Sequence, residues 1–310
     1  MNKKLPNFLL LGPPKTATTS LHYYLSQHPQ IFMSETKETR YFDYGYKEDL
    51  AGYDQYFINA ADQIILGEAT PTYAFLPFAA DRIKKHFPGM KLILCFRNPV
   101  DRAFSGWSMR KARGAEKNSF REALELNIEQ RKTVDFFGEA GARRWMDDHI
   151  ANNKKNEILY RTYIDGSMYN EQLKYYRSLF ADDQIKIIFT EDLKKNAQDT
   201  LKEIYCFLKA DTSFTHTDTE EKNTFKKVRL KPLFNLFGKK KVKDVKKIIP
   251  AWMHKILKPI MRQPDVKPEI TEEDRIFATR IFKESIAELE LLTGRDLSAW
   301  KTTYKNSLNK

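Results

Sequence analysis

The chain has 310 residues, of which 41% are hydrophobic and 13% aromatic, with 12 Gly and 13 Pro. This composition excludes a disordered, collagen-like or rod-like repeat protein and predicts one sizeable core. No apolar run approaches the roughly 20 residues that a membrane-spanning helix needs, which excludes an integral membrane protein. The net charge of +12 is confined to residues 226–262, where 13 Lys and Arg accompany a single acidic residue, Asp244.

No Gly/Ser-rich or Pro-rich linker divides the chain. We therefore expect a single domain over residues 1–310, with residues 226–262 as a basic amphipathic insertion or lid within it. An apolar stretch after Lys3 and Lys4 imitates a signal peptide. We reject that interpretation, because cleavage would remove the motif at residues 12–20 described below.

The chain has two cysteines, Cys95 in an apolar run and Cys206 in a predicted helix. Two residues cannot form a disulfide framework, and they offer no metal-ligand spacing. We expect both to be buried free thiols and the compartment to be the reducing cytoplasm.

The predicted elements alternate between strand and helix. Residues 7–12 are a short apolar run that ends in Gly-Pro-Pro, the pattern of a buried strand that enters a loop. A helix is predicted over residues 18–25. Further buried strands are predicted at 63–67, 91–96 and 184–190, separated by stretches long enough for crossover helices. This order predicts an α/β fold whose central, mostly parallel sheet is flanked by helices on both faces.

The last predicted helix has recognisable ends. Thr271 is a suitable N-cap, acidic residues follow it in the first turn, and Gly294 suits the end of the helix. Apolar residues at helical spacing predict its inner face: Ile281, Phe282, Ile286, Leu289 and Leu292. We interpret this helix as scaffold.

The segment between the first strand and the first helix combines the groups that bind an anion. It offers backbone N–H groups, hydroxyls and one ammonium at a helix N-terminus. The nucleoside triphosphate loop needs a second Gly just before its Lys, whereas here Lys15 follows Gly12 by three residues, so this shorter loop should hold fewer phosphates. The alternative is that these side chains only cap the helix. The residues expected to hold the anion are Pro14, Lys15, Thr16, Ala17, Thr18, Thr19 and Ser20.

The predicted strand at 91–96 ends in a second candidate anion site. A Mg²⁺-dependent nucleotide hydrolase usually has an Asp at such a strand end, which holds the metal. Here Arg97 follows the strand, and its guanidinium can grip a phosphate without a metal. Ser105, in the second turn of the next predicted helix, could converge with Arg97 on one phosphate. The alternative is a structural pair between Arg97 and Asp101.

Two strand-to-helix turns that bind separated anionic groups suit 3′-phosphoadenosine 5′-phosphosulfate (PAPS). The sequence resembles the PAPS-dependent sulfotransferase family, in particular its bacterial and heparan-sulfate-type branch. The resemblance follows the chain in order and covers nearly all of it. Its strongest segments are Pro14–Leu21, Lys37–Asp43, Gly67–Tyr73 and Arg97–Ser105, and weaker ones are Gly166–Tyr169, Phe189–Leu193 and Leu291–Leu297.

The resemblance implies a catalytic role for two residues. Lys15 would stabilise the charge that grows on the leaving phosphate, while the hydroxyl residues of the first loop hold the 5′-phosphosulfate. Glu38 stands where the heparan-type enzymes place their catalytic carboxylate, which accepts the proton of the acceptor. Taken alone, Glu38 would be interpreted as a solvated carboxylate in a charged loop. The product is 3′-phosphoadenosine 5′-phosphate (PAP), and no metal is required.

Two positions depart from the family pattern. Most relatives have Gly where this chain has Ala17, whose methyl group is tolerable if the backbone there is already helical and otherwise crowds the phosphosulfate. Many heparan-type relatives have Lys where this chain has Ala69. A second cation near the acceptor or leaving group is therefore missing or supplied from elsewhere.

The basic segment 226–262 has three interpretations. It packs its apolar side on the core, it forms a lid that attracts an acidic glycan, or it contacts an anionic membrane surface. The first is the default, and the lid is compatible with it. Lys226, Lys227 and Arg229 are also candidates for the 3′-phosphate.

We expect an acceptor that is a carbohydrate or a small metabolite, with acidic glycans among the candidates. Neither the acceptor nor the oligomeric state follows from the sequence. Nucleic acid is not expected, because no recognition motif accompanies the basic charge. The rival functions are a kinase of the phosphate-loop type and a nucleotide- or membrane-binding scaffold without turnover.

Overall fold

The computed structural model describes residues 4–153, 158, 160–216 and 268–301. The described residues before the long gap and those from Ile270 onward belong to one compact unit. Residues 226–262, for which the sequence predicts a basic insertion, lie outside the described residues. The interpretation of the whole chain as a single domain therefore stays a prediction.

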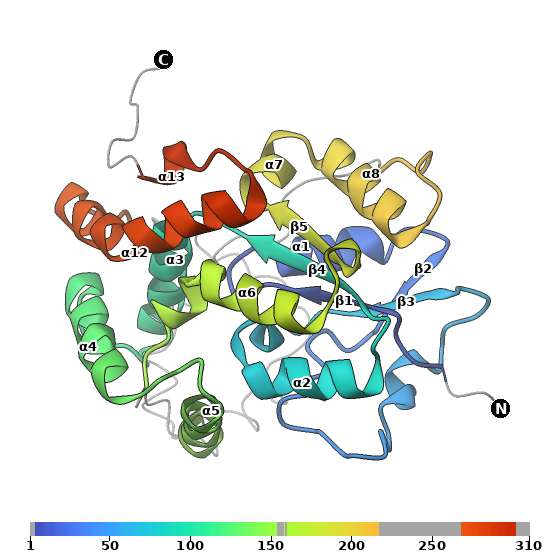
Figure 1. The fold of residues 1–310 in the computed structure, drawn as a ribbon, viewed down its shortest axis with the longest axis horizontal. Helices are drawn as coiled ribbons and strands as arrows, with labels where there is room; N and C mark the ends of the chain where they lie inside the picture. Colours follow the sequence, from blue (N-terminus) through green and yellow to red (C-terminus); the bar gives the residue numbers. More distant parts are fainter. Residues whose placement is uncertain (1–3, 154–157, 159, 217–267, 302–310) are drawn as a thin grey trace, which may run out of the picture. The chain divides into compact units, whose positions relative to one another are not determined.

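A five-stranded sheet in the order β2-β3-β1-β4-β5 forms the centre of the fold (Figure 1). All neighbouring strands pair in parallel. This confirms the expected α/β fold with a parallel sheet, and the four predicted strands all occur. The strands are β1 (Phe8–Leu11), β2 (Ile31–Met33), β3 (Ile65–Glu68), β4 (Lys91–Phe96) and β5 (Ile185–Phe189).

The helices that connect and cover the strands have the following bounds. They are α1 (Thr18–Leu25), α2 (Pro77–His86), α3 (Pro99–Ala112), α4 (Phe120–Thr133), α5 (Glu139–Asn153), α6 (Tyr169–Leu179), α7 (Thr190–Lys195), α8 (Ala197–Leu208), α12 (Glu272–Thr293) and α13 (Ser298–Lys301). Short 3₁₀ helices are η1 (Asp54–Phe57), η2 (Pro71–Phe75), η3 (Asp165–Ser167) and η4 (Asp182–Gln184).

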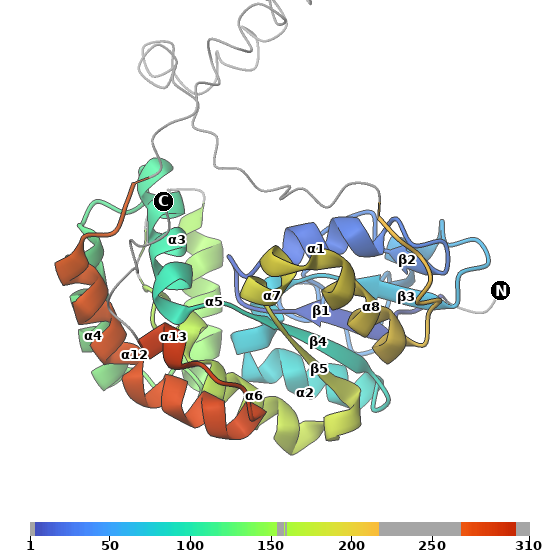
Figure 2. The same cartoon turned by 90° about the horizontal axis from the view of Figure 1, so that it is seen from above.

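Alternate side chains of the strands face two apolar layers, as the two-residue period of a strand requires. Phe8 and Leu10 of β1 pack in the layer with α1, α7 and α8. Leu9 and Leu11 pack in the layer with α2, α3, α6 and α12. Figure 2 shows α1 and α8 on one side of the sheet and α2 and α6 on the other. Both faces of the sheet are therefore covered.

Helix α12 follows its prediction closely. The Thr271 side chain accepts a hydrogen bond from the backbone N–H of Asp274, and Gly294 ends the helix with a φ of 65°. Phe282, Ile286 and Leu289 are buried, while the other two residues of the predicted face are partly buried against the same core. No helix within the described ranges has the length and apolar character to cross a membrane.

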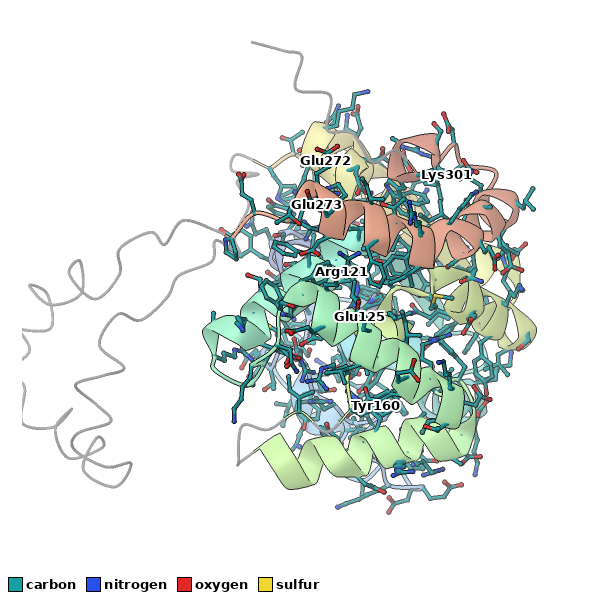
Figure 3. The ribbon with its side chains drawn as sticks, turned by 90° about the vertical axis from the view of Figure 1, so that its left-hand side faces the viewer. Arg121, Glu125, Tyr160, Glu272, Glu273 and Lys301 are labelled. Atoms are coloured by element: carbon teal, nitrogen blue, oxygen red, sulfur yellow. The ribbon has the colours of Figure 1, made fainter. Side chains whose placement is uncertain are left out.

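The helices α4 and α12 lie side by side (Figure 3). The guanidinium of Arg121 lies over the Phe277 ring, 4.6 Å from its centroid, and 3.7 Å from the Glu125 carboxylate. An open groove between these helices is lined by Asn118, Glu122, Glu125, Leu126, Ile128, Glu129 and Phe277. It contains none of the residues that the sequence predicts for the site.

The two cysteines have different environments. Cys95 is buried, as expected, but Cys206 is exposed, so that part of the prediction is wrong. The reason is the amphipathic pattern of α8, which turns Leu201, Ile204 and Tyr205 toward the core. Cys206 lies on the other face of that helix. Burial raises the pKa of the Cys95 thiol to about 12, which keeps this sulfur protonated.

Candidate functional site

Three neighbouring strands end at the same edge of the sheet and carry the three candidate segments. Strand β1 pairs with β4, with Leu11 opposite Leu94, and with β3, with Leu9 opposite Glu68. Because the strands are parallel, the loops after β3, β1 and β4 start next to one another (Figure 1). The topology therefore brings the Lys15 loop, the Arg97 turn and the end of β3 to one edge.

The loop after β1 has an unusual backbone. Lys15 has a φ of 86° and Ala17 a φ of 67°, both left-handed. Thr16 is completely buried, and its hydroxyl donates to the Pro13 carbonyl at 2.8 Å. The Cys95 thiol of β4 donates to the Thr16 carbonyl. The loop is thus fastened inside itself and to the neighbouring strand.

Ala17 bears on the first departure from the family pattern. Its φ of 67° and ψ of 15° are left-handed rather than helical, so the condition under which we considered its methyl group harmless is not met. A left-handed Ala costs about 1–2 kcal/mol relative to the right-handed form. The loop holds this conformation through its contacts with β4.

The first turn of α1 suits a negative ligand. It begins after Ala17, which makes no side-chain cap, and it contains no acidic residue. The N–H groups and the dipole of this turn therefore favour an anion. Thr18 and Ser20 are buried, and Thr19 is partly exposed.

The Arg97 turn is attached to the first loop. The Nη1 atom of Arg97 donates to the Lys15 carbonyl at 3.3 Å. Asp101, the alternative partner of Arg97, instead pairs with Arg275 at 2.9 Å. The Asn98 N–H donates to the Glu191 carboxylate at 2.9 Å, which fixes the turn on the far side. The two predicted anion sites are joined, and the alternative ion pair is not the one that the structure shows.

Ser105 lies in the second turn of α3 and is partly exposed. It follows Asp101 by four residues and therefore lies on the same side of the helix. Its convergence with Arg97 on one phosphate stays a prediction.

Sequence reasoning missed Arg102, which links the loop to a distant segment. Arg102 is 4% exposed and donates to the Ser167 hydroxyl and the Tyr163 carbonyl, both at 2.6 Å, and approaches the Pro14 carbonyl at 3.5 Å. Burial lowers the pKa of its guanidinium to about 10. A Cβ at Gly166 would lie 2.7 Å from Nη1, so a side chain there would displace the guanidinium. Arg102 lies in the Arg97–Ser105 motif, but the motif alone does not show whether this arginine faces a ligand or the core.

The Glu38 side chain is 48% exposed and forms an ion pair with Lys37 at 2.9 Å. Its backbone is left-handed, with a φ of 63°, and so is that of Arg40, with a φ of 56°. The Glu38 N–H donates to the carbonyl of Ala69 at 3.0 Å. The segment that carries Glu38 is therefore laid along the chain that leaves β3.

Glu68 is the second residue that sequence reasoning missed. Its carboxylate is fully buried at the end of β3 and accepts hydrogen bonds from Thr39, from Tyr53 at 2.8 Å and from Thr70 at 2.9 Å. Burial raises its pKa, against the opposing effect of these hydroxyl groups. In the sequence, the only sign of this buried carboxylate and its hydroxyl donors is the Glu of the Gly67–Tyr73 motif.

The fold is α/β, and the loops gather the candidate anion-binding groups at one edge of its sheet. The sulfotransferase domain family model matches residues 5–290, so the chain belongs to that family. A crystal structure of a sulfotransferase from Alicyclobacillus acidocaldarius has the same fold, with a TM-score of 0.65 at 24% identity over 96% of this chain and all of that one.

Two curated relatives illustrate the similarity in sequence. A membrane-associated sulfotransferase of Dictyostelium discoideum is 28% identical over 66% of this chain, and human heparan sulfate glucosamine 3-O-sulfotransferase 6 is 33% identical over 38% of it. The chain covers 56% and 34% of the lengths of these relatives. It therefore corresponds to only part of each of them.

Gly12 provides a test of the loop geometry. Its φ is 144°, and a Cβ there would lie 2.7 Å from the Cys95 carbonyl oxygen. We expect Gly12→Ala to lower the free energy of unfolding by about 2–4 kcal/mol in urea denaturation. The matched control is Gly89→Ala, whose Cβ would meet no atom within 4 Å and which should change stability by less than about 0.5 kcal/mol. Equal effects of the two variants would contradict the close contact between the loop and β4.

Proposed function

We propose that the chain transfers a sulfuryl group from PAPS to a hydroxyl or amine group of a carbohydrate or small-metabolite acceptor and releases PAP. The observation that carries the proposal is the attachment of the Arg97 turn to the Lys15 loop, through the 3.3 Å contact between the Arg97 guanidinium and the Lys15 carbonyl. Two cationic residues at adjacent strand ends suit a ligand with two separated anionic groups.

The residues present fit such a donor. The uncapped first turn of α1, with Lys15 beside it, suits the 5′-phosphosulfate. Arg97, with Ser105 on the following helix, suits the 3′-phosphate. We assign these roles to the side chains and to the backbone N–H groups of residues 14–20.

The reaction requires one bond to form and one to break at sulfur. The acceptor oxygen or nitrogen forms the new bond, and the electron pair of the broken S–O bond stays on the 5′-phosphate oxygen. Lys15 stabilises that developing charge more in the transition state than in the ground state. Glu38 accepts the proton that the acceptor loses. No step needs a metal, and full activity in the presence of EDTA is part of the proposal.

A carbohydrate acceptor is favoured by the relatives whose names refer to heparan sulfate. The solvent-exposed Glu38 is compatible with access by a large acceptor. A cytoplasmic location, with peripheral membrane contact through residues 226–262, is part of the proposal. One relative is described as membrane-associated, which supports the membrane contact but not the compartment. Acidic glycans are the first acceptors to test.

Replacing Lys15 tests the activity itself. With ³⁵S-labelled PAPS and desulfated, N-deacetylated heparan sulfate, the wild type should label the polysaccharide. We expect Lys15→Ala to lower kcat about 100- to 1000-fold, because the cation at the leaving oxygen is lost. The control is Lys202→Ala, an exposed residue of α8. Mg²⁺-dependent turnover of ATP by the wild type, without sulfuryl transfer, would favour the kinase instead.

Arg97→Ala should weaken the binding of PAP about 10- to 100-fold in isothermal calorimetry, because one charge-assisted contact is lost. The KM for the acceptor should change much less. Arg280→Ala, an exposed arginine of α12, is the control. An unchanged affinity for PAP in Arg97→Ala would remove this residue from the nucleotide site.

Glu38→Gln should fold and bind PAP like the wild type but lose at least about 100-fold in kcat, because the amide cannot accept the proton. Glu35→Gln is a matched control, since Glu35 is an exposed carboxylate of the same segment. A near-normal kcat in Glu38→Gln would exclude Glu38 as the base while leaving the nucleotide site intact.

A further inference from the structure

Every hydrogen-bond partner that the described residues give to the Glu68 carboxylate is a hydroxyl group. Thr39 and Thr70 donate to Oε2, and Tyr53 donates to Oε1. A carboxylate without a cationic partner is costly to bury, so several donors are needed to keep it there. Such a centre holds its donors in one arrangement, because a shift of any of them leaves a buried oxygen unsatisfied.

Residues 34–46, here called the Glu38 segment, are attached to Glu68 and to the two residues that follow it by hydrogen bonds from three successive residues. The Glu38 N–H donates to Ala69, the Thr39 hydroxyl to Glu68, and the Arg40 N–H to the Thr70 hydroxyl at 3.3 Å. These three attachments span the two left-handed residues of the segment. A left-handed non-glycine residue persists only where surrounding contacts impose it.

Of these three hydrogen bonds, the one from the Thr39 hydroxyl to Glu68 joins two side chains, whereas the other two start from backbone N–H groups. Thr39 lies between Glu38 and Arg40 and is buried, whereas Glu38 is half-exposed. The bond to Glu68 therefore draws the middle of the segment inward and leaves the neighbouring carboxylate at the surface. The hydrogen bond from the Glu38 N–H to the Ala69 carbonyl places this residue beside the end of β3. By itself it does not set the direction of the Glu38 side chain.

We infer that Glu68 and Thr39 are positioning residues for the Glu38 carboxylate: the buried Thr39–Glu68 hydrogen bond imposes the left-handed turn that presents Glu38 to the acceptor. This inference rests on the proposed role of Glu38 as the base. Neither Glu68 nor Thr39 touches the reacting atoms. They act on the rate because a displacement of about 1 Å at a reacting group costs as much as a hundredfold in rate.

The same carboxylate offers a matched control. Tyr53 donates to Oε1 from the start of the 3₁₀ segment η1 and is completely buried. Tyr53→Phe removes one hydrogen bond to Glu68 but keeps the ring, which stacks on Tyr41 at 4.4 Å between centroids. Thr39→Val removes another bond to the same group and keeps the shape of the side chain. Only Thr39 lies in the Glu38 segment.

The experiment compares Thr39→Val, Thr39→Ser and Tyr53→Phe in the full-length protein. We expect Thr39→Val to lower kcat for labelling of desulfated, N-deacetylated heparan sulfate about 10- to 100-fold and to leave the Kd for PAP within twofold. Hydrogen exchange of the Glu38 amide should become faster. Tyr53→Phe should lose a similar amount of stability in urea but keep kcat within about threefold, and Thr39→Ser, which retains the hydroxyl, should restore kcat.

Equal losses of kcat in Thr39→Val and Tyr53→Phe would overturn the inference, because they would reflect general destabilisation. A wild-type kcat and unchanged Glu38 amide exchange in Thr39→Val would also overturn it. If the wild type labels no acceptor, the proposed function fails, and the exchange of the Glu38 amide still decides whether Thr39 holds the segment. If transfer is normal in the wild type and in Thr39→Val, only the positioning role fails.

Discussion

The parallel pairing of β1 with both β3 and β4 is the constraint on which the site depends. It places the ends of three buried strands side by side: β1 leads into the Lys15 loop, β4 leads into the Arg97 turn, and the residue after β3, Ala69, accepts the hydrogen bond of the Glu38 N–H. The strands themselves are almost without polar side chains, so their position is fixed by two apolar layers rather than by the ligand. The groups that we propose to bind the donor are therefore held in place by the core of the fold, and such preorganisation is the condition for electrostatic stabilisation of a transition state.

The two residues proposed to meet the reacting atoms have the same backbone peculiarity. Lys15 and Glu38 are both left-handed, with φ values of 86° and 63°, at a cost of roughly 1–3 kcal/mol each. In each case a neighbouring threonine is buried and bonded: Thr16 to Pro13 and to β4, and Thr39 to Glu68. The side chain that we propose to face the ligand is thus in each case followed by a buried residue that holds the backbone in place.

The sequence predicted the elements whose signals are local. Apolar runs located β1 and β4, and a hydroxyl residue with a following acidic turn located the start of α12. Strand β2 was missed, because three residues give too short a pattern. The roles of Arg102 and Glu68 could not be predicted, since a charged residue in a motif looks the same whether it faces a ligand or the core. Only the long-range bonds, such as that from Arg102 to Tyr163, distinguish the two.

The two sides of the site differ in how they are built, and this explains why the donor is easier to infer than the acceptor. The proposed donor side consists of backbone N–H groups, Lys15 and Arg97 at the ends of core strands, where the packing of the sheet allows few alternatives. The proposed acceptor side depends on residues 34–46, which leave the sheet and are held by backbone and side-chain hydrogen bonds, such as those of the Glu38 N–H to Ala69 and of the Thr39 hydroxyl to Glu68. At Ala69, which is completely buried, the chain also lacks the cation found in many heparan-type relatives. We therefore expect recognition of an acceptor to come from loop side chains, which vary without changing the fold.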